Sequence, residues 1–129
     1  MEGPAPVSIL RQGSYLVASI HAALDDTQME RFRRDLIEAI GNQRARGVII
    51  DVAALDVLDS FGSRTLRDIA EMARLRGART VIVGIQPDVA FAMVRLGMGT
   101  GTIPTALDLE EGLAFLEGAT DPAPGSSGG

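Results

Sequence analysis

The sequence predicts a single α/β domain with a mixed, mostly parallel β-sheet, an N-terminal β-hairpin and about four packed helices. Short apolar segments alternate along the chain with segments whose apolar residues recur every three to four positions, as strands alternate with helices. The 129 residues, 46% of them hydrophobic, suffice for one domain with a buried core and are too few for two. We expect residues 1–118 to form this domain and the Pro/Gly/Ser-rich residues 119–129 to be a disordered tail.

A hairpin and a helix are expected at the N-terminus. Residues 7–24 contain two β-rich segments separated by a Gln-Gly-Ser sequence that is typical of a tight turn. Residues 25–42 place apolar side chains at helical spacing. These side chains are Met29, Phe32, Leu36, Ile37 and Ile40. An aspartate or threonine among residues 25–27 is suited to cap the helix, and Gly41 is placed to end it.

Two buried parallel strands are predicted in the centre of the chain. Residues 47–55 form an unbroken apolar run, as expected of a strand covered on both faces, and residues 80–85 form another. Asp51, inside the first run, is expected to be a hydrogen-bonded structural carboxylate. Between the strands, residues 63–77 predict a helix that a glycine closes. Its apolar stripe is Leu66, Ile69, Ala70 and Ala73.

The C-terminal part predicts two more helices and a weak strand. Residues 87–97 begin with proline and end with glycine, which suits a third helix. Residues 102–107 contain a proline, so we place this strand at the edge of the sheet. Asp108 and Glu111 resemble a capping box in front of a short last helix.

Composition excludes several classes of function. The formal net charge of −5 disfavours binding to nucleic acid or to an anionic membrane. With no cysteine and a single histidine, His21, the chain lacks the usual ligands of a metal site. It has no glycine-rich phosphate loop and no apolar stretch of membrane-spanning length. Its first residues show no basic segment followed by a long apolar one, so we expect no secretion leader. We therefore expect a cytoplasmic protein with no catalytic centre, metal or cofactor.

The sequence Asp-Ser-Phe-Gly at residues 59–62 follows the first buried strand directly. In open α/β sheets the functional surface usually lies beyond the carboxyl ends of the strands, which is where this motif falls. The residues alone favour Ser60 as the N-cap of the following helix, because serine satisfies the free amides at a helix start. A second role for its hydroxyl as a chemical handle stays open.

This motif and the order of elements resemble the STAS domain of bacterial anti-sigma-factor antagonists, which commonly carry Asp-Ser-Ser/Thr-Gly-Leu here. Phe61 and Ser63 depart from that pattern. The stretches VGIQPDVAFAMVRLGM, TALDLEEGLAFL and ALDD resemble more narrowly the RsbS-type proteins of stressosomes. The similarity covers residues 6–117, and the two departures favour the RsbS type over a simple antagonist.

The resemblance implies a non-enzymatic scaffold and negative regulator in a stress-response cascade. Such a protein would form a homodimer and a large hetero-oligomer with RsbR-type STAS paralogues, and would sequester an RsbT-type serine kinase. Phosphorylation of Ser60 would release the kinase, and an RsbX-type phosphatase would reverse the modification.

Four further residues are expected to contact the partner. The resemblance places Asp59, Phe61 and Gly62 beside the phosphoacceptor, and Asp25 on the neighbouring loop. Asp25 is equally suited to cap the first helix, and Gly62 to serve a purely conformational role. Two other functions remain as alternatives, a soluble antagonist that binds an anti-sigma kinase one to one, and a STAS module that binds a nucleotide or other small ligand.

Overall fold

The computed structural model describes residues 5–95 and 103–120. Five strands form one sheet in the order β1-β2-β3-β4-β5, with β1 antiparallel to β2 and all other neighbours parallel. The strands are β1 Val7–Gln12, β2 Tyr15–Ile20, β3 Gly47–Asp51, β4 Arg79–Val83 and β5 Thr105–Ala106. The helices are α1 Asp26–Gln43, α2 Ser60–Leu75, α3 Pro87–Arg95 and α4 Leu109–Thr120. The predicted α/β architecture is confirmed.

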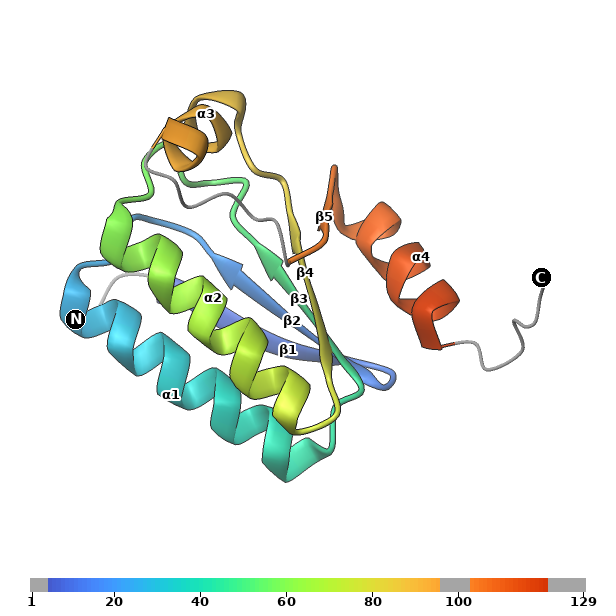
Figure 1. Cartoon of the computed structure of the whole chain (residues 1–129). Helices are drawn as coiled ribbons and strands as arrows, with labels where there is room; N and C mark the ends of the chain where they lie inside the picture. The colour runs from blue at the N-terminus through green and yellow to red at the C-terminus, as the bar shows by residue number, and fades with distance from the viewer. Residues whose placement is uncertain (1–4, 96–102, 121–129) are drawn as a thin grey trace.

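The helices cover the two faces of the sheet unequally. Helices α1 and α2 lie side by side across one face, α4 lies against the other, and α3 sits beyond one end of the strands (Figure 1). The larger core therefore lies between the sheet and the α1–α2 pair, and Leu36, Ile50 and Ile69 are completely buried in it. A smaller core forms under α4 around Ile49, Val81 and Leu116.

The N-terminal hairpin is present as predicted, but its turn has two residues because Gln12 of the predicted Gln-Gly-Ser turn belongs to β1. Strand β1 pairs with β2 from Val7↔Ile20 to Gln12↔Tyr15, which leaves only Gly13 and Ser14 in the connection. Gly13 has a φ of +63°, a left-handed conformation that glycine adopts without steric cost.

Helix α1 buries the predicted face but ends later than predicted. All five apolar residues expected on that face are buried. Gly41 lies inside the last turn, because the chain leaves the helix at Arg44, which adopts a left-handed φ of 52°. The N–H of Ala45 then bonds the carbonyl of Ile40 at 3.1 Å. The expectation that Gly41 ends the helix was wrong, since a non-glycine residue takes the terminating conformation.

The two central strands are buried on both faces, as predicted. Val48, Ile49 and Ile50 are fully buried, and β4 is buried from its second residue onward. Helix α2 between them ends at Leu75, two residues before Gly77, whose φ of +86° confirms its predicted role in closing the helix.

The C-terminal elements follow the prediction with two differences. β5 is a two-residue strand at the sheet edge. The Asp108 carboxylate caps α4 through the N–H of Glu111 at 2.9 Å, but Glu111 reaches back to the N–H of Leu107 at 2.5 Å rather than to Asp108. Helix α4 continues to Thr120, past the expected boundary at 118. The predicted glycine stop at 97 and residues 121–129 of the predicted tail lie outside the described residues.

Candidate functional site

Hydrogen bonds and buried side chains hold the segment between β3 and α2 in place. Asp51 accepts a hydrogen bond from the N–H of Ala53 at 2.9 Å, which confirms its predicted structural role. The side chain of Gln86 donates to the carbonyl of Ala53 at 2.8 Å. Leu55 and Leu58, which belong to the segment, are buried. These contacts fix the chain path that leads into the first turn of α2.

Asp59, not Ser60, is the N-cap of α2. The Asp59 carboxylate accepts the N–H of Gly62 at 2.8 Å, and its carbonyl accepts the N–H of Ser63 at 2.9 Å. Asp59 has the extended backbone typical of a cap, and Ser60 is the first helical residue. The expectation that Ser60 caps the helix was wrong. Both residues are good caps, and the packing of the helix onto α1 selects the register that places the aspartate at the cap.

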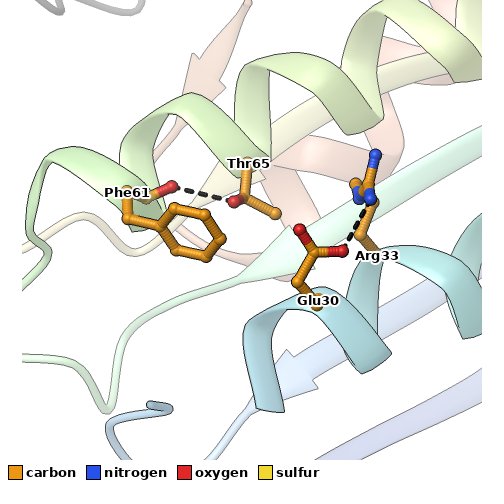
Figure 2. Close-up of polar contacts among 4 residues, drawn as sticks. All are labelled: Glu30, Arg33, Phe61 and Thr65. Atoms are coloured by element: carbon orange, nitrogen blue, oxygen red, sulfur yellow. Dashed lines mark hydrogen bonds and ion pairs between the residues drawn. The ribbon is translucent and has the colours of Figure 1, made fainter. Parts of the chain in front are cut away.

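Ser60 is the accessible hydroxyl among the three in the first two turns of α2. Ser60 is partly exposed, whereas Ser63 is 0% exposed and Thr65 only 4% exposed. The Thr65 hydroxyl also donates to the carbonyl of Phe61 at 2.8 Å (Figure 2). A macromolecule that approaches the start of α2 can therefore reach the Ser60 hydroxyl but not those of Ser63 and Thr65.

Phe61 borders a polar groove of about 520 Å³ between α2 and α1. Its ring is partly buried, and it lies on the α2 side of the groove opposite Glu30 of α1 (Figure 2). Glu30 itself is paired with Arg33 at 2.6 Å. Phe61 is thus anchored against the core while part of its ring faces outward, and it is placed to contact a partner.

Gly62 has an internal role. It is buried, and a methyl group added there would lie 2.8 Å from Leu58 Cδ1 and 3.3 Å from Met29 Cε. Its φ lies outside the left-handed region, so no special backbone conformation requires glycine. The expectation of a purely conformational role was wrong, and the approach of a partner's backbone to Gly62 stays a prediction. The close packing of Leu58 and α1 on α2 explains the glycine.

Asp25 caps α1 at the same end of the domain (Figure 1). Its carboxylate accepts the N–H of Gln28 at 2.7 Å, and the Gln28 side chain accepts the N–H of Asp25 at 2.9 Å. This reciprocal pair is a capping box, so the capping role weighed for Asp25 is present. Its carboxylate is exposed beside the first turn of α2, because Met29 of α1 packs near Gly62.

The sequence alone did not identify Asp59 as the cap. Asp59 and Ser60 are adjacent residues of cap type, and local propensity ranks them almost equally. The spacing of the buried Gly62, Leu66 and Ile69 is the same with either residue as the cap, so the helical pattern did not separate the two.

Comparison with known proteins settles the family. The sequence matches the STAS domain over residues 7–112. The chain belongs to the STAS domain family. The predicted resemblance and the single-domain α/β fold are both confirmed.

The STAS domain is similar to stressosome proteins in particular. A serine-to-glutamate variant of RsbS from Moorella thermoacetica shares 34% identity with a TM-score of 0.79, covering 89% of this chain and 97% of that chain. A chain in the structure of the stressosome, described as a signal integration and transduction hub, shares 32% identity with a TM-score of 0.72, covering 87% and 97%.

A longer curated protein is also similar. The RsbT co-antagonist protein RsbRA of Bacillus subtilis strain 168 is 26% identical over 105 residues, which cover 81% of this chain and 38% of RsbRA. The STAS domain described here therefore spans about two fifths of the length of that relative.

Within residues 5–95 and 103–120, no three His, Asp or Glu side chains are grouped so as to hold a metal ion. His21 is exposed, and its Nε2 lies 3.0 Å from the hydroxyl of Ser8. No helix in this described part is long and apolar enough to span a bilayer.

Proposed function

We propose that this STAS domain is a non-enzymatic stressosome scaffold and negative regulator that sequesters an RsbT-type serine kinase and releases it when Ser60 is phosphorylated. The similarity to RsbS and to a stressosome chain over nearly the whole domain supports the scaffold role. The description of RsbRA as an RsbT co-antagonist supports the class of kinase. The exposure of Ser60 at the first turn of α2 is the observation that carries the phosphorylation site.

Phosphorylation of Ser60 requires no unfolding. Its side chain is partly exposed and lies next to Val57, which is 67% exposed, and to the exposed Asp59. Ser63 and Thr65 are buried, so a kinase would reach them only if α2 separated from its neighbours. Access therefore selects Ser60 over the other two hydroxyls in the first two turns of α2.

The phosphate acts by changing the surface charge. A phosphoserine adds about −1.5 to −2 charges at neutral pH. At Ser60 this charge lies beside the carboxylate of Asp59 and near that of Asp56, both exposed. A partner that fits a neutral hydroxyl and the apolar Val57 and Phe61 would have to desolvate the added charge, which costs several kcal/mol. The bound kinase is expelled without a change of fold.

The remaining partners follow from the stressosome proposal. Asp25, Asp59 and Phe61 contact the kinase around Ser60, and the domain assembles with RsbR-type paralogues as a homodimer and in a large hetero-oligomer. An RsbX-type phosphatase removes the phosphate and restores binding. The freed kinase acts in a cytoplasmic stress-response cascade.

Phosphopeptide mapping after incubation with the RsbT-type kinase of the same organism and ATP tests the acceptor. The wild-type chain should take up one phosphate, on the peptide that contains Ser60, and Ser60→Ala should take up none. Ser63→Ala is the matched control, because it removes a buried hydroxyl with no hydrogen-bond partner and should be phosphorylated like wild type. Stoichiometric phosphate on Ser60→Ala would contradict the proposal.

Size-exclusion chromatography with the RsbR-type paralogue tests the scaffold role independently of phosphorylation. The mixture should elute as a very large particle. Elution only as monomer or dimer would replace the scaffold by a soluble antagonist that binds its kinase one to one.

A further inference from the structure

The exposed face of α2 carries arginines in line with Ser60. Helical spacing places residues four, seven, eleven and fourteen positions after Ser60 on the same side of the helix. These residues are Arg64, Arg67, Glu71 and Arg74, and all are exposed. Arg74 is paired with Glu71. Arg64 and Arg67 take part in no ion pair found within residues 5–95 and 103–120.

Arg64 is the cation within reach of Ser60. Residues four apart on a helix have Cβ atoms about 5–6 Å apart. Long side chains on a helix lean toward its N-terminus, which directs the stem of Arg64 back over the turn that contains Ser60. Arg67 lies about 10.5 Å from Ser60 along the axis, at 1.5 Å per residue, so it starts nearly a full turn further away.

The other charged groups near Ser60 leave Arg64 available to pair with an acidic group at position 60. The acidic neighbour Asp68 follows Arg64 by four residues, and an acid on this C-terminal side forms the weaker order of pair. The Asp59 carboxylate is engaged with the N–H of Gly62, and Arg33 across the groove is engaged with Glu30. An acid at position 60 would precede Arg64 in the favourable order and would also lie at the positive end of the helix dipole.

We propose that Arg64 binds the phosphate on Ser60 through a charge-assisted hydrogen-bonded pair along α2. This inference rests on the proposed phosphorylation of Ser60 for its biological meaning. A guanidinium presents two parallel N–H groups to a phosphate, which fixes direction as well as charge. Arg64 is thus a positioning residue that draws the phosphate along the helix and away from the Asp59 carboxylate.

The test uses the full chain with phosphoserine incorporated at position 60 during translation. A ³¹P NMR titration measures the second pKa of this phosphate, which is about 6 in a free phosphoserine. Arg64→Gln should raise that pKa by about half a unit, because the dianion loses its counter-ion. Arg67→Gln is the matched control, since it removes the same charge from the same face one turn further away, and should raise the pKa by no more than about 0.2 units.

Equal pKa shifts for the two variants, or no shift for Arg64→Gln, would overturn the inference. Arg64→Lys adds a second check, because lysine keeps the charge without the paired N–H groups and should give a pKa between those of the wild-type chain and Arg64→Gln. Both positions are exposed, so circular dichroism should show unchanged folding. Since the phosphate is installed without a kinase, this result is independent of whether the kinase modifies Ser60.

Discussion

The first turns of α1 and α2 lie next to each other and begin with the same type of cap, yet only α1 has a complete capping box. In α1, Asp25 binds the N–H of Gln28 and the Gln28 side chain returns a bond to the N–H of Asp25. In α2, Asp59 binds the N–H of Gly62, and glycine has no side chain to return the bond. The start of α2 is therefore held by one side-chain bond where α1 has two.

The start of α2, residues 59–62, lacks the second bond of a capping box, and we call it the open turn. The difference from α1 indicates that packing rather than capping determined it. The third position after the cap points at solvent in α1, where Gln28 is exposed, but toward Leu58 and Met29 in α2. A side chain there would crowd the ends of the Leu58 and Met29 side chains, and with glycine at this position α2 lacks the second half of a capping box. Ser60, two residues before this glycine, is partly exposed, which is the property the proposed phosphorylation needs.

The largest effect is expected from Ser60→Asp, which gives α2 the Asp-Asp start that α1 has at Asp25 and Asp26. The fold should be kept, because an acid in the first turn suits the helix dipole. Binding of the RsbT-type kinase should weaken at least about a hundredfold, since desolvating the added charge at the interface costs several kcal/mol. Kinase pull-down and circular dichroism on the purified variant measure both properties.

Ser60→Ala is the control for that experiment and should retain the kinase, because it leaves the surface neutral. If folded Ser60→Asp binds like wild type, purified phosphoprotein decides whether a single charge was too poor a mimic. Kinase binding to the phosphoprotein at wild-type affinity would exclude charge at Ser60 as the release switch.

Gly62→Gln would copy the capping residue of α1 into α2, and the next largest effect is expected here. Glutamine gains about 1 kcal/mol of helix propensity over glycine and could return a bond to the N–H of Asp59. Its Cβ, however, would lie 2.8 Å from Leu58 Cδ1, inside a packed region. We expect net destabilisation of about 1–2 kcal/mol, because overpacking outweighs the local gains. Urea denaturation gives the free energy of unfolding.

The converse exchange, Gln28→Gly, is the matched variant in α1. It opens an exposed turn without any clash and should cost about 1 kcal/mol through propensity and the lost bond. If Gly62→Gln instead stabilises the chain, the packing explanation for the open turn is incorrect.

Most of the fold was predictable from the sequence because the apolar pattern records burial directly. The alternation of apolar runs with helical stripes gave the strand and helix order, and the apolar face predicted for α1 is buried. Helix boundaries were less predictable. Arg44 ends α1 in a left-handed conformation that local sequence assigns to Gly41, since tertiary packing continues the helix past the glycine.

The site was predictable in position but not in detail. The motif follows a buried strand and lies at the start of α2, as expected. Which of Asp59 and Ser60 caps the helix, and why Gly62 is glycine, depend on Leu58 and on Met29, 33 residues earlier in the chain. Contacts between residues so far apart leave no local pattern, so a single sequence does not reveal them.

Asp59→Ala tests the single bond that holds the open turn. The variant leaves the N–H of Gly62 without its acceptor, so we expect a loss of about 1 kcal/mol in the free energy of unfolding. Asp25→Ala should cost about as much or slightly more, because it removes the cap of a complete box. Urea denaturation compares the two variants, and an unchanged stability of Asp59→Ala would show that the cap contributes nothing.

The smallest effect is expected from Ser60→Ala on stability. This variant shows whether Asp59 or Ser60 caps α2, which the sequence alone did not decide. If Ser60 were the cap, its replacement by alanine would cost about 1 kcal/mol. At the first helical position, however, the serine hydroxyl binds no amide of the turn, and alanine is the better helix former. We therefore expect the free energy of unfolding to change by less than about 0.5 kcal/mol. A loss as large as that of Asp59→Ala would mean that the hydroxyl shares the capping role. The phosphate would then be added to a group that stabilises the helix, and release of the kinase would include a change in the stability of α2 as well as in its surface charge.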